Sequence, residues 1–120
     1  MKVLAIRGAT QLASDAADEM RDAVVDLLTT LFRENELTTE DLISILFTAT
    51  PDIHSDFPAA AARTLDLGSI PLICAQEIDV EGALPLVVRV MVHAYSSRGH
   101  ADIKHIYRRG ATALRKDIAQ

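Results

Sequence analysis

The longest amphipathic pattern of the chain lies near its N-terminus. Between residues 14 and 35, large apolar residues recur at spacings of three and four, which predicts a helix with one apolar face. These residues are Met20, Val24, Leu27, Leu28 and Leu31. Ser14 is the expected N-cap, and the acidic residues that follow it lie near the positive end of the helix dipole.

Short apolar runs elsewhere predict strands. They cover residues 3–6, 42–49, 70–80 and 86–95, and an alternating pattern over 101–110 predicts a last strand. Between them, residues 57–65 predict a short helix with Pro58 in its first turn. One long helix with four or five strands in mixed order indicates an α+β fold, in which a mixed sheet packs against that helix.

The stretch PLVVRVMVHA, residues 85–94, is apolar except at Arg89 and His93. Such a run is typical of a strand that is buried on both faces. Alternation along a strand places Arg89 on the same face as Val87, Met91 and His93. A buried guanidinium requires compensation. Arg89 therefore either pairs with an internal acid or lines a polar pocket, and the pattern leaves both alternatives open.

Length and composition limit the function classes. The 120 residues suffice for a single domain, 1–120, and 49% of them are hydrophobic, which leaves apolar surface for burial between subunits. The net charge is −5 without a basic cluster, which argues against nucleic-acid binding. The one cysteine, Cys74, fits a reducing compartment. We find no signal peptide and no membrane span, so we expect a cytoplasmic protein without a membrane partner.

Several residue sets have a structural interpretation beside a chemical one. Asp52, His54 and Asp56 have a spacing that could bind a metal, but they lie between a proline and a helix start, where such residues form turns and caps. Glu77, Asp79 and Glu81 alternate along the end of a predicted strand, which is typical of a sheet edge exposed to solvent. Cys74 in an apolar strand is more often a small core residue than a nucleophile. The sequence contains no glycine-rich phosphate loop.

The basic residues are strongly biased toward arginine, with nine Arg against three Lys. Arginine is preferred where a carboxylate is bound by two parallel hydrogen bonds. Arg7 ends the first predicted strand and Arg89 lies within another. Considered alone, Arg63 and Arg115 are best interpreted as solvated surface charges.

Five segments together resemble the AroH-class, Bacillus-type chorismate mutases, in order over almost the whole chain. They are IRGAT (6–10), ATPDIHSDFPAAAAR (49–63), PLICAQEIDV (71–80), VVRVMVH (87–93) and HIYRRGATALR (105–115). The resemblance implies a homotrimer that forms a pseudo-α/β barrel, with active sites between adjacent subunits. It also implies the rearrangement of chorismate to prephenate on the route to phenylalanine and tyrosine, without a metal or cofactor.

The resemblance assigns roles to four inner residues. Arg7 matches the arginine that binds a substrate carboxylate, and Tyr107 matches a tyrosine that binds a carboxylate. Arg89 matches the arginine that faces the ether oxygen of the substrate. Glu77 matches the glutamate that accepts a hydrogen bond from the ring hydroxyl.

Further residues match the periphery of the family's site. They form a pocket wall, a mouth and a C-terminal tail that closes over the mouth: Ile73 and Cys74; Phe57, Ala59 and Arg63; Leu114 and Arg115. The chain departs from the family at Ala60, where relatives carry lysine, and at Lys116, which replaces a proline.

Two other functions are considered. One is a non-catalytic trimeric module that binds a small anion with its arginines. The presence of Glu77 beside them argues against it, because capture of an anion gains nothing from a carboxylate. The other is a metal-dependent hydrolase built on Asp52, His54 and Asp56, which the turn interpretation of that segment disfavours.

Overall fold

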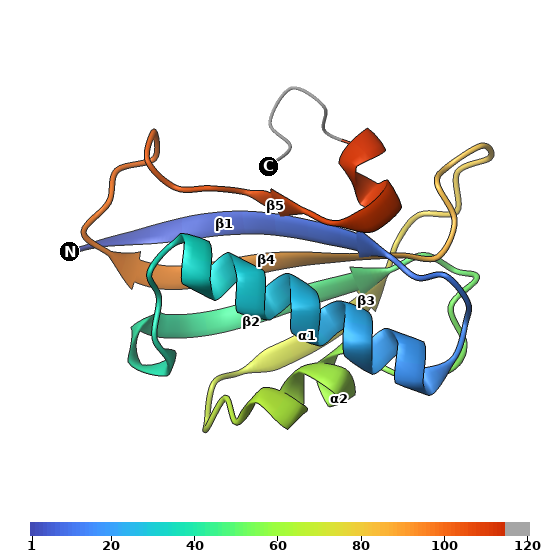
Figure 1. Cartoon of the computed structure of the whole chain (residues 1–120), viewed down its shortest axis with the longest axis horizontal. Helices are drawn as coiled ribbons and strands as arrows, with labels where there is room; N and C mark the ends of the chain where they lie inside the picture. Colours follow the sequence, from blue (N-terminus) through green and yellow to red (C-terminus); the bar gives the residue numbers. More distant parts are fainter. Residues whose placement is uncertain (115–120) are drawn as a thin grey trace.

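The computed structural model of the chain describes residues 1–114, in which one mixed sheet carries both α-helices on a single face (Figure 1). The predicted α+β fold with a mixed sheet against one long helix is confirmed. The strands are β1 (Lys2–Gln11), β2 (Leu42–Ala49), β3 (Leu72–Gln76), β4 (Val87–Ser96) and β5 (Ile106–Tyr107). The helices are α1 (Ala17–Glu34) and α2 (Pro58–Ala62).

The sheet is built around β4, in the order β3-β2-β4-β1-β5. β4 is antiparallel to both β1 and β2, whereas β3 and β5 run parallel to their neighbours β2 and β1. Neighbouring side chains on the sheet therefore come from segments far apart in the sequence. The shortest dimension of the molecule is 21 Å, as expected for two layers.

The apolar face of α1 forms the core against the sheet, as its periodicity predicts. Val24, Leu27 and Leu31 are fully buried. Gly8 on β1 permits the close approach of the helix, because a Cβ at this position would lie 3.1 Å from Cδ1 of Leu27 and 3.0 Å from Cγ1 of Val90. The helix thus rests directly on the centre of the sheet.

The predicted start of α1 is wrong. Its N-cap is Ala16, which makes no side-chain capping bond, and Ser14 lies outside the helix. The neighbouring carboxylate serves another purpose, because Asp15 accepts backbone N–H bonds from His54 and Ser55 at 2.9 Å each. The Ser55 hydroxyl and these N–H groups hold the pKa of Asp15 below its ordinary value. Asp15 therefore connects the start of α1 to the loop before α2.

α2 forms where it is expected, with a proline in its first turn. A 3₁₀ turn, Arg63–Leu65, continues it to the predicted end at residue 65. Its buried alanines, Ala59, Ala61 and Ala62, have small side chains and allow α2 to pack beside α1 against β2 and β3.

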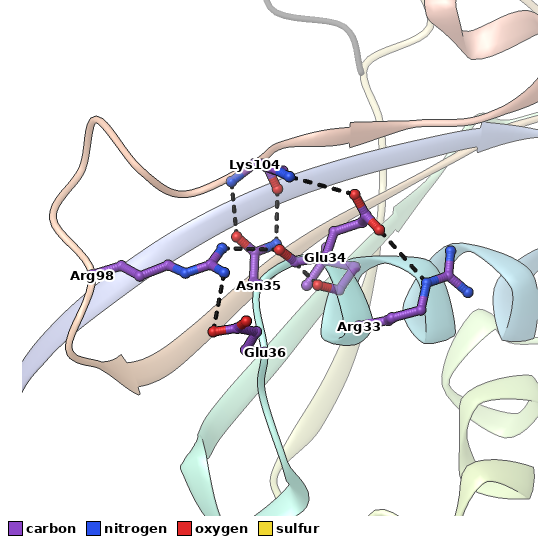
Figure 2. Close-up of polar contacts among 7 residues, drawn as sticks. Arg33, Glu34, Asn35, Glu36, Arg98 and Lys104 are labelled. Atoms are coloured by element: carbon purple, nitrogen blue, oxygen red, sulfur yellow. Dashed lines mark hydrogen bonds and ion pairs between the residues drawn. The ribbon is translucent and has the colours of Figure 1, made fainter.

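The last strand is shorter than predicted, because the segment before it is held by a side chain instead of a neighbouring strand. Asn35, which is 2% exposed, donates to the carbonyl groups of Leu31 and Lys104 at 2.9 Å and accepts from the N–H of Lys104 at 2.8 Å. Arg98 adds a hydrogen bond to the carbonyl of Glu34 at 2.9 Å (Figure 2). Of the last strand predicted over 101–110, only Ile106 and Tyr107 pair with β1 as a strand.

Within a single chain, β4 is buried on one face only and not on both as predicted. Val88, Val90 and Val92 point toward the helices and are buried, whereas Arg89 and Tyr95 lie on the opposite face and are exposed. We call this opposite side of the sheet the open face, because neither α1 nor α2 covers it (Figure 1). The apolar side chains exposed on it are Val3, Leu46, Ile73 and Tyr95.

Neither helix of the described residues combines the length and the apolarity that crossing a bilayer requires.

Candidate active site

A cavity of about 300 Å³ lies on the open face, over the centre of the sheet. Its lining residues come from four strands and are Arg7, Gly8, Leu46, Thr48, Arg89, Val90, Met91 and Tyr107. The register explains this convergence, since Arg89 lies across from Ala9 on β1 and from Thr48 on β2. Tyr107 is paired with the same Ala9 from the other side. Three of the predicted inner residues, Arg7, Arg89 and Tyr107, are therefore brought together.

The fourth inner residue, Glu77, forms an ion pair with Arg89. Oε2 of Glu77 lies 3.1 Å from Nε of Arg89, and the two side chains are 16% and 45% exposed. Both alternatives that the sequence left open for Arg89 are thus realised at once, because it pairs with an acid and lines a cavity. The next two acidic residues, Asp79 and Glu81, are exposed in the following loop, which fits a solvated edge.

Thr48 belongs to this cluster, although the sequence analysis missed it. It is half-buried on β2, and its hydroxyl donates to Oε2 of Glu77 at 2.6 Å. Its alternation with Leu46 indicates that both side chains share one face of β2. The local pattern does not reveal that this face meets Arg89, because that depends on the register with β4.

The position of Arg7 and Tyr107 depends on how β5 is held against β1. The N–H of Arg7 donates to Nδ1 of His105 at 3.0 Å, just before β5 begins. Just after β5, Arg108 forms two hydrogen bonds with the carboxylate of Asp26 on α1, at 3.0 and 3.2 Å. Hydrogen bonds and charge from Asp26 raise the pKa of Arg108. Tyr107 is 4% exposed and packs with Ala9, Ala111 and Leu114.

The predicted mouth residues lie away from this cavity. Phe57 and Arg63 are exposed at the two ends of α2, and Ala59 is a buried residue of α2 itself. The N–H of Ala59 donates to Sγ of Cys74 at 3.4 Å, so the cysteine faces α2 on the helical side of the sheet. Phe57 and Cys74 line a second cavity of about 370 Å³.

Two further predictions concern the rim of the site. Ile73 is exposed on the open face, beyond the residues that line the first cavity. Leu114 packs against the cluster around Tyr107. Arg115 lies outside the described residues, so its predicted position in a closing tail stays a prediction.

The segment that was considered as a metal site has structural roles in the part of the chain that is described. Asp52 accepts a hydrogen bond from the hydroxyl of Thr50 at 2.5 Å and from the N–H of Leu86 at 3.0 Å. These bonds connect the end of β2 to the start of β4. Residues 1–114 bring together no group of three or more His, Cys, Asp or Glu side chains with metal-binding geometry.

The arrangement suits one kind of ligand. Two guanidinium groups and a phenol surround a space large enough for a small organic molecule, and one carboxylate lies beside them. The cations and the phenol can bind carboxylates, while the glutamate can accept a hydrogen bond from a hydroxyl group. A small molecule with carboxylate and hydroxyl groups fits this set.

Comparisons with known proteins agree with this interpretation. The family described as "Chorismate mutase type I" matches residues 3–118. The chain is 36% identical to the chorismate mutase AroH of Bacillus subtilis over 99% of this chain and 94% of the relative. It is 35% identical to the chorismate mutase AroH of Thermus thermophilus over 97% and 96%. A solved chorismate mutase from Clostridium thermocellum superposes with a TM-score of 0.90 at 43% identity, covering 92% of this chain and 99% of that one.

Proposed function

The chain belongs to the type I chorismate mutase family, and we propose that its active site is the open-face cavity with Arg89 and Glu77 as its catalytic residues. The protein is an isomerase that converts chorismate to prephenate. The observation that carries the proposed site is the convergence of Arg7, Arg89 and Tyr107 on one cavity beside Glu77.

The reaction determines what the protein has to supply. In this rearrangement a C–O bond breaks and a C–C bond forms within one molecule, so no atom is lost and no proton is exchanged. Catalysis then comes from holding the reactive conformer and from stabilising charge that develops in the transition state. Arg7 and Tyr107 bind the carboxylate of the enolpyruvyl arm and hold that arm folded over the ring.

Arg89 and Glu77 act on the developing charge. Because C–O cleavage runs ahead of C–C formation, the ether oxygen becomes more negative and the ring more positive. A guanidinium beside that oxygen stabilises the transition state more than the substrate. Glu77 accepts a hydrogen bond from the ring hydroxyl and places negative charge near the ring. A rate enhancement of about 10⁶-fold, or about 8 kcal/mol, is a reasonable demand on such a site.

We also propose that the protein is a homotrimer whose subunits share each site, with the sheets inside a pseudo-α/β barrel. The apolar side chains on the open face support burial against another subunit. The mouth residues Phe57, Ala59 and Arg63 lie apart from the cavity of their own chain, which is expected if they complete the site of a neighbour. A reducing compartment, the cytoplasm, fits the single free cysteine.

The function is tested by adding chorismate to the purified protein. We expect loss of the diene absorbance and formation of prephenate, and light scattering should give the mass of three 13.1-kDa chains. Binding of chorismate without conversion would instead indicate the non-catalytic anion-binding module. Relatives named as enzymes over nearly the full chain do not support that alternative.

A further inference from the structure

Thr48 lies between the two side chains that the proposed mechanism uses. It is directly across from Arg89 in the pairing of β2 with β4, and beside Ala75 in the pairing of β2 with β3. Glu77 follows the end of β3, and its N–H donates to the carbonyl of Ala49 at 2.9 Å. Both the backbone and the carboxylate of Glu77 are thus held by consecutive residues of β2.

The two contacts of Glu77 converge on the same atom. Oε2 accepts the hydroxyl of Thr48 at 2.6 Å and lies 3.1 Å from Nε of Arg89. A bond from a hydroxyl to a carboxylate is among the stronger hydrogen bonds in proteins. A threonine on a strand is also stiff at χ1, so its hydroxyl has a defined position. Thr48 therefore favours one orientation of a side chain that otherwise has three rotatable bonds.

Without the bond from Thr48, the carboxylate of Glu77 could pair with the guanidinium of Arg89 in a second geometry. Arginine and carboxylate groups readily form two parallel hydrogen bonds, which would engage both oxygens of Glu77 and one edge of the Arg89 fork. That arrangement would withdraw both groups from a substrate. The hydroxyl of Thr48 opposes it by holding Oε2, which leaves Oε1 for the ring hydroxyl.

We propose that Thr48 is a positioning residue for the rearrangement, which fixes the carboxylate of Glu77 so that one oxygen faces the substrate. This inference rests on the proposed function of Glu77. Because the hydroxyl acts on the reactive arrangement, its loss should lower kcat more than it raises KM.

The test compares variants that differ in the hydroxyl at position 48. Thr48→Val and Thr48→Ala remove it, whereas Thr48→Ser retains it. We expect both hydroxyl-free variants to lose about tenfold in kcat, with Thr48→Ser close to the original enzyme. Ser44→Ala is the matched control, because it removes a hydroxyl that contacts Nδ1 of His93 at 3.3 Å on the same strand. It should retain full activity.

A double-mutant cycle with Glu77→Gln identifies the path of the effect. If Thr48 acts through Glu77, then Thr48→Val should change kcat less than about twofold in the Glu77→Gln background. Equal losses in both backgrounds, or a Thr48→Ser variant as slow as Thr48→Val, would overturn the inference. Full activity of Thr48→Val beside an impaired Glu77→Gln would overturn the role of Thr48 alone. Full activity of Glu77→Gln would instead overturn the proposed function of Glu77.

Discussion

The two faces of the sheet are built from the same strands but have different surroundings. On the helical face, Val88, Val90 and Val92 of β4 are at most 4% exposed. On the open face, Tyr95 of the same strand is 47% exposed and the side chain of Arg89 is 45% exposed. Within residues 1–114, α1 and α2 form a second layer on the helical face only. Side chains of one strand therefore lie either in the core or around the proposed active site, according to the face on which they lie.

Because of this difference, we expect substitutions on the two faces to change different properties of the protein. Substitutions on the helical face remove packing that the chain makes with itself, and they should change the free energy of unfolding. Substitutions around the open-face cavity remove groups that we propose contact the substrate, and they should change the kinetics of a protein that still folds. The predictions below test this separation.

The largest effect is expected in the core of the helical face. Replacing the fully buried Leu27 by alanine should lower the free energy of unfolding by about 2–5 kcal/mol. Within one subunit, the matched change on the open face, Leu46→Ala, should have a smaller effect of about 1 kcal/mol, because Leu46 is 43% exposed there. Any further loss from the proposed subunit interface should depend on protein concentration. Urea denaturation at several protein concentrations measures both. An equal loss in the two variants would contradict the separation of the faces.

The next largest effect is expected in the cavity. Arg89→Lys should lower kcat by about 10²-fold or more, which corresponds to about 2.7 kcal/mol, because an ammonium group cannot reproduce a fixed planar fork. Its unfolding midpoint should remain close to that of the original protein. Arg33→Lys is the matched control, since Arg33 pairs with Glu34 on the exposed side of α1. Near-normal turnover of Arg89→Lys would refute the proposed role.

The sequence predicts those elements whose pattern is local. The strand at 42–49 has the predicted bounds because its apolar run stops at a Thr-Pro-Asp turn, and α1 follows from its helical period. The prediction of Ser14 as the N-cap is wrong, because a residue's preference for capping does not determine where the helix begins. The first strand extends to Gln11, beyond the apolar run, because its polar residues continue to pair with β4.

The residues of the site could not all be predicted, because their contacts depend on how distant strands pair and which face the helices cover. Alternation correctly separates Arg89 from Val88, but it cannot show that, in residues 1–114, α1 and α2 both lie on the face of Val88. Thr48 could not be found, because its contact with Glu77 depends on the register of three strands. The proposed roles of Arg7, Glu77 and Tyr107 came from the family resemblance. The structure adds that Arg7 and Tyr107 line one cavity with Arg89, and that Arg89 pairs with Glu77.

A smaller effect is expected at Arg63, which we propose completes the cavity of a neighbouring subunit. Arg63→Ala should raise KM about tenfold with little change in kcat, because a residue at the mouth attracts the anion equally in the ground and transition states. Steady-state kinetics with chorismate separate the two constants. Arg21→Ala removes an exposed arginine of α1 and controls for the change in net charge. A large loss of kcat at constant KM would place Arg63 among the inner residues.

The smallest effect is expected at the edge of the helical face, where Asp15 joins α1 to the loop before α2. Hydrogen bonds from Ser55 and His54 lower the pKa of Asp15 in the folded protein below its ordinary value of 3.8. Its stabilising contribution is therefore present above that pH and disappears as the pH falls through the folded pKa. Asp15→Asn should lower the unfolding temperature slightly at pH 7, and the difference should vanish in acid. Asp22→Asn controls for charge, and a constant difference at all pH values would show that ionisation of Asp15 does not stabilise this joint.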